Sequence, residues 1–235
     1  MVAPVSADSY WQKVSWNSPD GVILVGEYHR ASRASANTWV LLHGLGSSKG
    51  EWEDFARKLT EKGGGAFLYD ARGHNESNHL ANGQPISYKD WLRPGPGTPW
   101  DGMPADLASA VQMLHKRFHV SEKKIAVGGA SLGANVALVY ASEHPRVPAL
   151  VLLSAGVEYA GINIVQPWMH MDSRPVFAAA SPQDPEAYQT LQFLLQQRPQ
   201  IPGRVAEGQG AQHGVNMFKD PEFTKKLLSW MKEVE

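Results

Sequence analysis

Cysteine is absent from the 235-residue sequence, which excludes disulfides, thiolate metal sites and cysteine nucleophiles together. No apolar run approaches the roughly 20 residues that a membrane-spanning helix needs. An excess of one charge is also lacking: 22 basic residues nearly balance 23 acidic ones, which leaves no positive footprint for a phosphate backbone. We therefore expect a soluble protein with no membrane span and no nucleic-acid partner.

The length and even composition of the chain indicate one domain. A chain of 235 residues can bury a sizeable core, and no shift in composition divides it, so we expect a single domain over residues 1–235. The opening segment, MVAPVSADS, is small and polar. We expect either a cytoplasmic protein or an exported one whose signal peptide has been removed. The sequence leaves the compartment and the oligomeric state open.

Short apolar strands alternate with helical patterns, which predicts an α/β fold with a mostly parallel sheet covered on both faces. An opening antiparallel hairpin is expected from residues 10–16 and 22–29, because turn-forming residues separate them. Further strands are expected at residues 38–42, 66–69, 125–127, 149–153, 176–180 and 204–206. Helices are expected at residues 51–62, 104–118, 134–142, 185–197 and 221–232. Between residues 70 and 100, Gly, Pro and Asn remove the periodicity and predict a long surface excursion.

Residues 129–133 read GASLG, a G-x-S-x-G pentapeptide between a predicted strand and a predicted helix. A serine on a tight strand-to-helix turn has its hydroxyl exposed, where a base can reach it. The pattern also arises by chance in glycine-rich chains, and its serine could instead cap the following helix. The placement between a strand and a helix favours Ser131 as a nucleophile.

A serine hydroxyl needs a base to take its proton and an acid to hold that base in the right tautomer. Asp184 follows the predicted strand at residues 176–180, and His213 follows the one at residues 204–206. Loops after parallel strands emerge at the same edge of the sheet, so we expect these side chains to lie near Ser131.

The chain resembles the α/β-hydrolase family over nearly its whole length. The resemblance lies in the order Ser131, Asp184, His213 and in three motifs: HGLG at residues 43–46, DARGHNES at residues 70–77 and GASLG. It implies the α/β-hydrolase fold, with an N-terminal antiparallel hairpin and helices on both faces of the sheet. The short interval between Ser131 and Asp184 leaves no room for a large cap domain.

The resemblance also implies the role of each site residue. Ser131 is the nucleophile, His213 the general base and then the general acid, and Asp184 the orienting carboxylate. The main-chain N–H groups of Leu45 and Leu132 form the oxyanion hole. The implied activity is that of a serine esterase that takes small or short-chain carboxylic esters through an acyl-enzyme and needs no cofactor. A thioesterase, peptidase or acyltransferase with the same triad stays an alternative, as does a non-catalytic binding protein with this fold.

The acid of the triad has competing interpretations. Asp184 could be the N-cap of the helix that opens at Pro185, since Asp before Pro is a good helix start. Glu158 and Asp172, which follow the preceding predicted strand, are then the reserve acids.

Four large side chains are candidates for the walls of an acyl pocket: Trp91, Trp100, Trp168 and Met169. Packing of these side chains on the core is an equally good interpretation.

The remaining histidines indicate structural roles. His43 is expected to order the oxyanion loop through hydrogen bonds. After His74, the family pattern normally has glycine where this chain has Asn75, a residue that tolerates positive φ. His115 and His119 stand four apart on a predicted helix, but without the glutamate of an H-E-x-x-H motif, so no metal site is expected.

Overall fold

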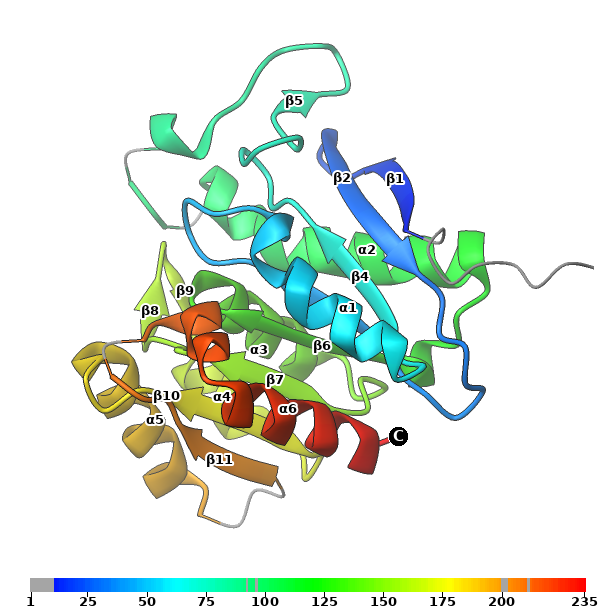
Figure 1. Cartoon of the computed structure of the whole chain (residues 1–235). Coiled ribbons are helices and arrows are strands. Elements are labelled where there is room, and N and C mark those ends of the chain that lie inside the picture. The colour runs from blue at the N-terminus through cyan, green and yellow to red at the C-terminus, as the bar shows by residue number, and fades with distance from the viewer. Residues whose placement is uncertain (1–10, 92, 96, 200–202, 211) are drawn as a thin grey trace, which may run out of the picture.

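The described residues, 11–91, 93–95, 97–199, 203–210 and 212–235, form a nine-stranded mixed sheet between helices in the computed structural model (Figure 1). The strand order is β1-β2-β4-β3-β6-β7-β10-β11, with β5 beside β2. These strands are β1 (Gln12–Asn17), β2 (Val22–His29), β3 (Thr38–Leu42), β4 (Gly65–Tyr69), β5 (His79–Leu80), β6 (Ile125–Ala130), β7 (Leu150–Leu153), β10 (Val176–Ala180) and β11 (Gly203–Glu207).

Strand β2 pairs antiparallel with β1, β4 and β5, whereas β4, β3, β6, β7, β10 and β11 run parallel to one another. This confirms the mostly parallel sheet with an N-terminal antiparallel hairpin. The part of the hairpin expected at residue 10 and the opening segment MVAPVSADS lie outside the described residues.

Six α-helices cover the two faces of the sheet within the described part of the chain. They are α1 (Glu53–Glu61), α2 (Met103–Phe118), α3 (Leu132–Glu143), α4 (Val165–His170), α5 (Pro185–Gln197) and α6 (Pro221–Glu233). Helices α1 and α6 lie side by side on one face, in front of the sheet in Figure 1, and the others pack on the opposite face. The sheet has a hydrophobic core on each face, and alternate residues of β3 belong to different cores. Trp39 and Leu41 face α1 and α6, whereas Val40 and Leu42 face α2 and α3. Covered on both faces, β3 reads as an unbroken apolar run.

The strand before GASLG and the helix after it are longer than the sequence pattern indicated. Strand β6 continues to Ala130, and α3 begins at Leu132. The apolar pattern ends early because Gly128 and Gly129 have no side chain to show it. Close packing requires that absence, since a Cβ on Gly128 would lie 2.7 Å from the Cβ of Val151.

The connection between β7 and β10 contains elements that the periodicity did not reveal. A two-stranded hairpin, β8 (Glu158–Tyr159) and β9 (Ile162–Asn163), is followed by the short helix α4. The buried amide of Asn135 on α3 holds this segment, because it donates to the carbonyl oxygens of Gly156 and Ile162 at 2.9 Å each. Among the described residues, the connection between β7 and β10 holds only this hairpin and α4, and no large cap domain is present.

Candidate active site

Ser131 occupies the sharp turn between β6 and α3. Its φ of 75° lies in the left-handed region, which is strained for a residue with a side chain. The Ser131 N–H donates to the carbonyl oxygen of Leu153 at 2.8 Å, so the neighbouring strand β7 holds the turn. Gly133 packs against β3, where a Cβ would lie 2.5 Å from the carbonyl oxygen of Leu42. Together these contacts leave the Ser131 hydroxyl at the carboxyl edge of the parallel strands.

Asp184, His213 and Ser131 form one chain of hydrogen bonds. Nδ1 of His213 lies 2.6 Å from Oδ2 of Asp184, and Nε2 of His213 lies 2.8 Å from Oγ of Ser131. A neutral imidazole with its proton on Nδ1 donates to the carboxylate and accepts from the hydroxyl. The His213 side chain is 44% exposed and that of Asp184 only 16%, so the imidazole is open to solvent while the carboxylate is mostly covered. The sequence-predicted trio is therefore brought together in the geometry of a nucleophile, a base and an orienting acid.

The side chain of Asp184 does not cap the helix that follows it. Asp184 stands at the N-cap of α5, but its carboxylate makes no capping hydrogen bond and is turned to His213 instead. The reserve acids have other partners. Glu158 accepts from the Asn163 amide at 3.3 Å, and Asp172 accepts from the Arg174 guanidinium at 2.6 and 2.8 Å.

The loop after β3 lies directly beside Ser131. A Cβ built on Gly44 would lie 3.4 Å from the Cβ of Ser131. The next residue, Leu45, is 52% exposed, and Leu132 is the first residue of α3. N–H groups in the first turn of a helix have no intrahelical acceptor, so the Leu132 N–H is available to an anion.

Two buried histidines join this loop to the loop that follows β4. His43 donates from Nδ1 to the Gly44 carbonyl oxygen at 2.7 Å and accepts the Ala71 N–H at Nε2 at 2.9 Å. His74 donates from Nδ1 to the Arg72 carbonyl oxygen at 2.9 Å and accepts the Gly46 N–H at Nε2 at 3.2 Å. Burial lowers the pKa of His43 to about 4 and also lowers that of His74. Both rings are therefore neutral acceptors, which agrees with the ordering role expected of His43.

The turn at Asn75 has the positive φ, 40°, that its position in the motif predicted. The Asn75 amide donates to Asp70 at 3.0 Å, and the ammonium of the buried Lys49 donates to the same carboxylate at 3.0 Å. A second buried pair lies nearby, in which the Arg72 guanidinium donates twice to Asp106 at 2.6 Å. Hydrophobic periodicity gave no signal for Lys49 or Asp106. Lys49 precedes the helix expected at residues 51–62, and Asp106 is a charged residue on the otherwise apolar face of α2.

Sequence reasoning also missed Tyr159, which stands on the β8–β9 hairpin. Its ring meets the His213 imidazole edge to face, with centroids 6.4 Å apart. Burial raises the pKa of Tyr159 to about 12, helped by the negative charges of Glu186 and Asp184. The phenol of Tyr159 is thus neutral and lies next to the His213 imidazole.

Of the four candidate pocket residues, the structure places two in the core. Trp168 is 1% exposed and its indole donates to the Leu194 carbonyl oxygen at 2.8 Å. Trp100 is 5% exposed and packs edge to face on Trp91, with ring centroids 5.0 Å apart. Trp91 is half-buried and Met169 is exposed, so these two keep surface that a ligand can reach.

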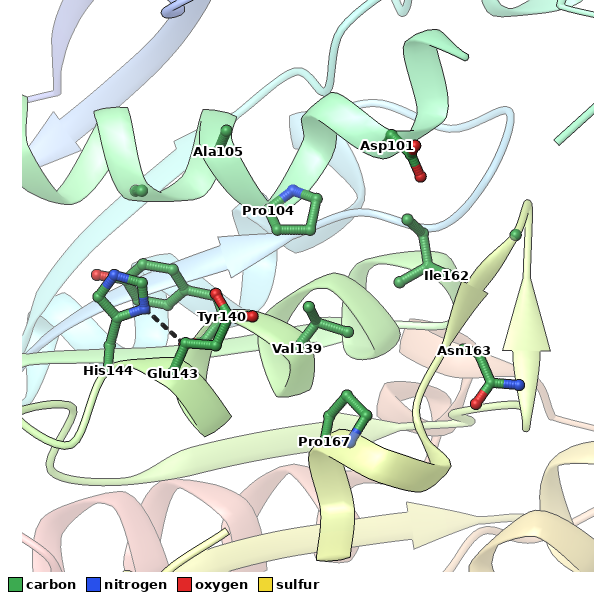
Figure 2. Close-up of a pocket in the computed structure, with 12 residues that line it drawn as sticks. Asp101, Pro104, Ala105, Val139, Tyr140, Glu143, His144, Ile162, Asn163 and Pro167 are labelled. Atoms are coloured by element: carbon green, nitrogen blue, oxygen red, sulfur yellow. Dashed lines mark hydrogen bonds between the residues drawn. The ribbon is translucent and has the colours of Figure 1, made fainter. Parts of the chain in front are cut away.

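A groove of about 640 Å³ lies between α2, α3, β9 and α4 (Figure 2). Pro104, Val139 and Pro167 form its apolar walls, with Glu143 at the end of α3. Val139 stands eight residues after Ser131, or about 12 Å along the helix axis. This wall of the groove is therefore distant from Ser131.

The described residues contain no cluster of three or more His, Cys, Asp or Glu side chains that could hold a metal ion. His115 donates to the Val120 carbonyl oxygen at 3.0 Å and belongs to an exposed helix end. In the same part of the chain, none of the helices has the length and apolar character needed to cross a bilayer.

The sequence matched no curated protein. An esterase from Pyrococcus furiosus is 20% identical with a TM-score of 0.72, over 95% of this chain and 92% of that chain. A dienelactone hydrolase from Anabaena variabilis is 18% identical with a TM-score of 0.69, over 96% of this chain and 99% of that chain. An esterase from Exiguobacterium antarcticum is 14% identical with a TM-score of 0.69, over 94% and 100%.

At these identities the three structures establish the shared α/β-hydrolase fold. A family model described as serine aminopeptidase, S33, matches residues 34–216, which is more than three quarters of the chain. The chain therefore belongs to this family of α/β-hydrolases.

Proposed function

We propose that this protein is a serine hydrolase that cleaves small carboxylic esters through an acyl-enzyme. The observation that carries the proposal is the unbroken chain of hydrogen bonds from Asp184 through His213 to Ser131, at 2.6 and 2.8 Å. The esterases among the similar structures support the same reaction class by analogy of fold.

In the first half of the reaction, Ser131 Oγ attacks the ester carbonyl carbon while Nε2 of His213 takes the hydroxyl proton. Asp184 stabilises the imidazolium that forms and keeps it oriented. The tetrahedral intermediate places a negative charge on the former carbonyl oxygen, which the N–H groups of Leu45 and Leu132 stabilise. His213 then gives its proton to the departing alkoxide, and the acyl group stays on Ser131.

In the second half, water replaces the alcohol. His213 takes a proton from the water as it attacks the acyl carbon, a second tetrahedral intermediate forms in the same oxyanion hole, and the acid is released as Ser131 regains its proton. The exposed edge of His213 gives water direct access to the base.

The same triad can act on thioesters and amides and can transfer acyl groups, and these reactions differ from ester hydrolysis in the leaving group or in the acceptor. The site is open, because the Leu45 and His213 side chains are exposed, and the aromatic ring of Tyr159 lies against His213. An open rim of this kind favours small esters over long lipid chains, which need a covered apolar groove. Met169 and Trp91 are the proposed contacts for the acyl or alcohol group.

The test replaces the nucleophile and surveys substrates. Ser131→Ala is expected to fold and to lose on the order of 10⁴ in turnover of p-nitrophenyl esters. Labelling by a fluorophosphonate, located by mass spectrometry, is expected at Ser131 and nowhere in the variant. Ser142→Ala, which removes a hydroxyl bonded only within α3, is the matched control and keeps wild-type activity.

Esters from acetate to palmitate are assayed beside matching thioester and aminoacyl anilide substrates. Faster turnover of short esters than of the anilides supports the proposal. Preference for aminoacyl anilides would instead assign the peptidase chemistry that the family description names. Full activity in Ser131→Ala contradicts the mechanism outright.

A further inference from the structure

The two amides that flank Leu45 are both bound to side chains from outside the loop. The Gly44 N–H donates to Oε1 of Glu51 at 2.9 Å, and the Gly46 N–H donates to Nε2 of His74 at 3.2 Å. Between them, the Leu45 N–H has no hydrogen-bond acceptor among the described residues. The loop is therefore held by hydrogen bonds at Gly44 and Gly46, and the Leu45 N–H between them is left as a donor next to Ser131.

The acceptor on the Gly46 side is fixed in place. Arg72 sets the tautomer of His74, because its carbonyl oxygen takes the Nδ1 proton at 2.9 Å and leaves Nε2 as the acceptor. The imidazole is 1% exposed and stacks on the Tyr88 ring with centroids 4.0 Å apart and an interplanar angle of 6°. His74 thus has one orientation, set by a hydrogen bond and a stacked ring.

The acceptor on the Gly44 side is a half-buried carboxylate. Glu51 lies in the one-turn helix at Lys49–Trp52, which the Trp52 indole attaches to the end of β3 by donating to the Leu42 carbonyl oxygen at 3.0 Å. Burial raises the pKa of Glu51, which indicates little solvent around the carboxylate. Glu51 stands four residues before the buried Phe55 and eight before the buried Leu59, so its side chain lies on the covered side of this segment and reaches the Gly44 N–H.

We infer that Glu51 and His74 are positioning residues that hold the Leu45 N–H on the developing oxyanion. This inference rests on the proposed serine hydrolase mechanism and adds two residues that act through the main chain. The geometry explains why they are needed. The HGLGSS loop has two glycines, and among the described residues a single main-chain hydrogen bond, from the Ser47 N–H to the Gly44 carbonyl oxygen at 3.2 Å, closes its turn. Without acceptors for Gly44 and Gly46 its amides can therefore rotate away from the substrate. Preorganised donors are effective because they do not reorient during the reaction.

The test separates loss of the acceptor from loss of shape. His74→Phe keeps a ring to stack on Tyr88 but cannot accept from Gly46, whereas His74→Gln places an amide oxygen near the former Nε2. Glu51→Met keeps length without an acceptor, and Glu51→Gln keeps the acceptor without the charge. Glu53→Met, at an exposed position in the first turn of α1, is the control for the methionine.

Steady-state kinetics on a p-nitrophenyl ester are combined with inhibition by a trifluoromethyl ketone. Ser131 adds to the ketone carbon to give an oxyanion in the oxyanion hole, so inhibitor affinity follows that hole. Rates are referred to the sites that a fluorophosphonate labels at completion, which removes any unfolded fraction from the comparison.

His74→Phe and Glu51→Met are expected to lower kcat by roughly 10- to 100-fold, below the roughly 10²- to 10³-fold loss for removing a donor outright. KM is expected to change by less than about threefold, and trifluoromethyl ketone affinity is expected to fall in parallel with kcat. The two Gln variants are expected to stay within about threefold of wild type.

The inference is overturned if the Phe and Met variants keep wild-type kcat, if KM rises instead of kcat falling, or if the Gln variants are as impaired as their partners. Failure of the proposed function gives a different result: the wild-type enzyme itself then neither hydrolyses the ester nor takes the fluorophosphonate at Ser131.

Discussion

The buried histidine His43 predicts a specific acid instability. Its side chain is 3% exposed, and both ring nitrogens are used, since Nδ1–H donates to Gly44 and Nε2 accepts from Ala71. Protonation of Nε2 would remove that acceptor and place a charge in the core. Burial accordingly lowers the pKa of His43 to about 4 in the folded protein.

The size of the effect follows from the difference between the folded and unfolded states. A histidine in the unfolded chain has a pKa of about 6.5. Between that pH and about 4, His43 is therefore protonated in the unfolded chain and neutral in the folded protein. The contribution of neutral His43 to the free energy of unfolding is therefore fully present above pH 6.5 and is lost as the pH falls towards 4. Each pH unit corresponds to about 1.4 kcal/mol, so His43 accounts for a loss of about 2 kcal/mol at pH 5 and about 3 kcal/mol at pH 4.

The assay is urea unfolding at pH 7, 6 and 5 for the wild type and for His43→Gln. Glutamine keeps an acceptor for Ala71 but does not titrate. The pKa of His74 is also lowered by burial, but His74 is present in both proteins and cancels in the comparison. We expect the free energy of unfolding of the wild type to fall by about 2 kcal/mol more than that of the variant between pH 7 and pH 5. Equal pH dependence in the two proteins would refute the reasoning.

Two further predictions concern the charged groups. Asp184→Asn is expected to lower kcat by roughly 10⁴ because the imidazole loses its orienting acceptor, while Glu158→Gln leaves kcat near wild type; comparable losses in both would remove Asp184 from the proposed triad. Arg72→Met leaves the Asp106 carboxylate, 1% exposed, without its bidentate partner and is expected to destabilise the fold by about 3–5 kcal/mol in urea unfolding. The double variant Arg72→Met, Asp106→Leu is expected to recover part of that loss. If it recovers none, the unpaired Asp106 carboxylate is not the source of the destabilisation.

The fold could be predicted from the sequence wherever buried strands leave an apolar run. Strands covered by helices on both faces, such as β3 and β10, have every residue buried and were located to the residue or nearly so. Their order along the chain then predicted one edge at which Ser131, Asp184 and His213 meet, and the structure brings these side chains into hydrogen-bond contact.

Elements that depend on tertiary contacts could not be located in this way. The β8–β9 hairpin has two residues per strand, too few for a period, and it is held by the side chain of Asn135 from α3. Likewise, nothing in the sequence pattern identifies the partner of Glu51, and only the folded loop shows that its carboxylate accepts from Gly44. The direction in which a polar side chain points is set by neighbours that are distant in sequence.

The turn that presents Ser131 has a consequence for how the molecule can be studied. Its left-handed backbone is unfavourable alone, by about 1–3 kcal/mol, and is held by Leu153 on β7 and by the approach of Gly133 to Leu42 on β3. The turn and its two partners belong to three separate stretches of the chain, at β6–α3, β7 and β3. The turn is therefore stabilised only once these strands have assembled. Under the proposed function, fluorophosphonate labelling of Ser131 after dilution from denaturant therefore reports the assembly of β3, β6 and β7 around this turn.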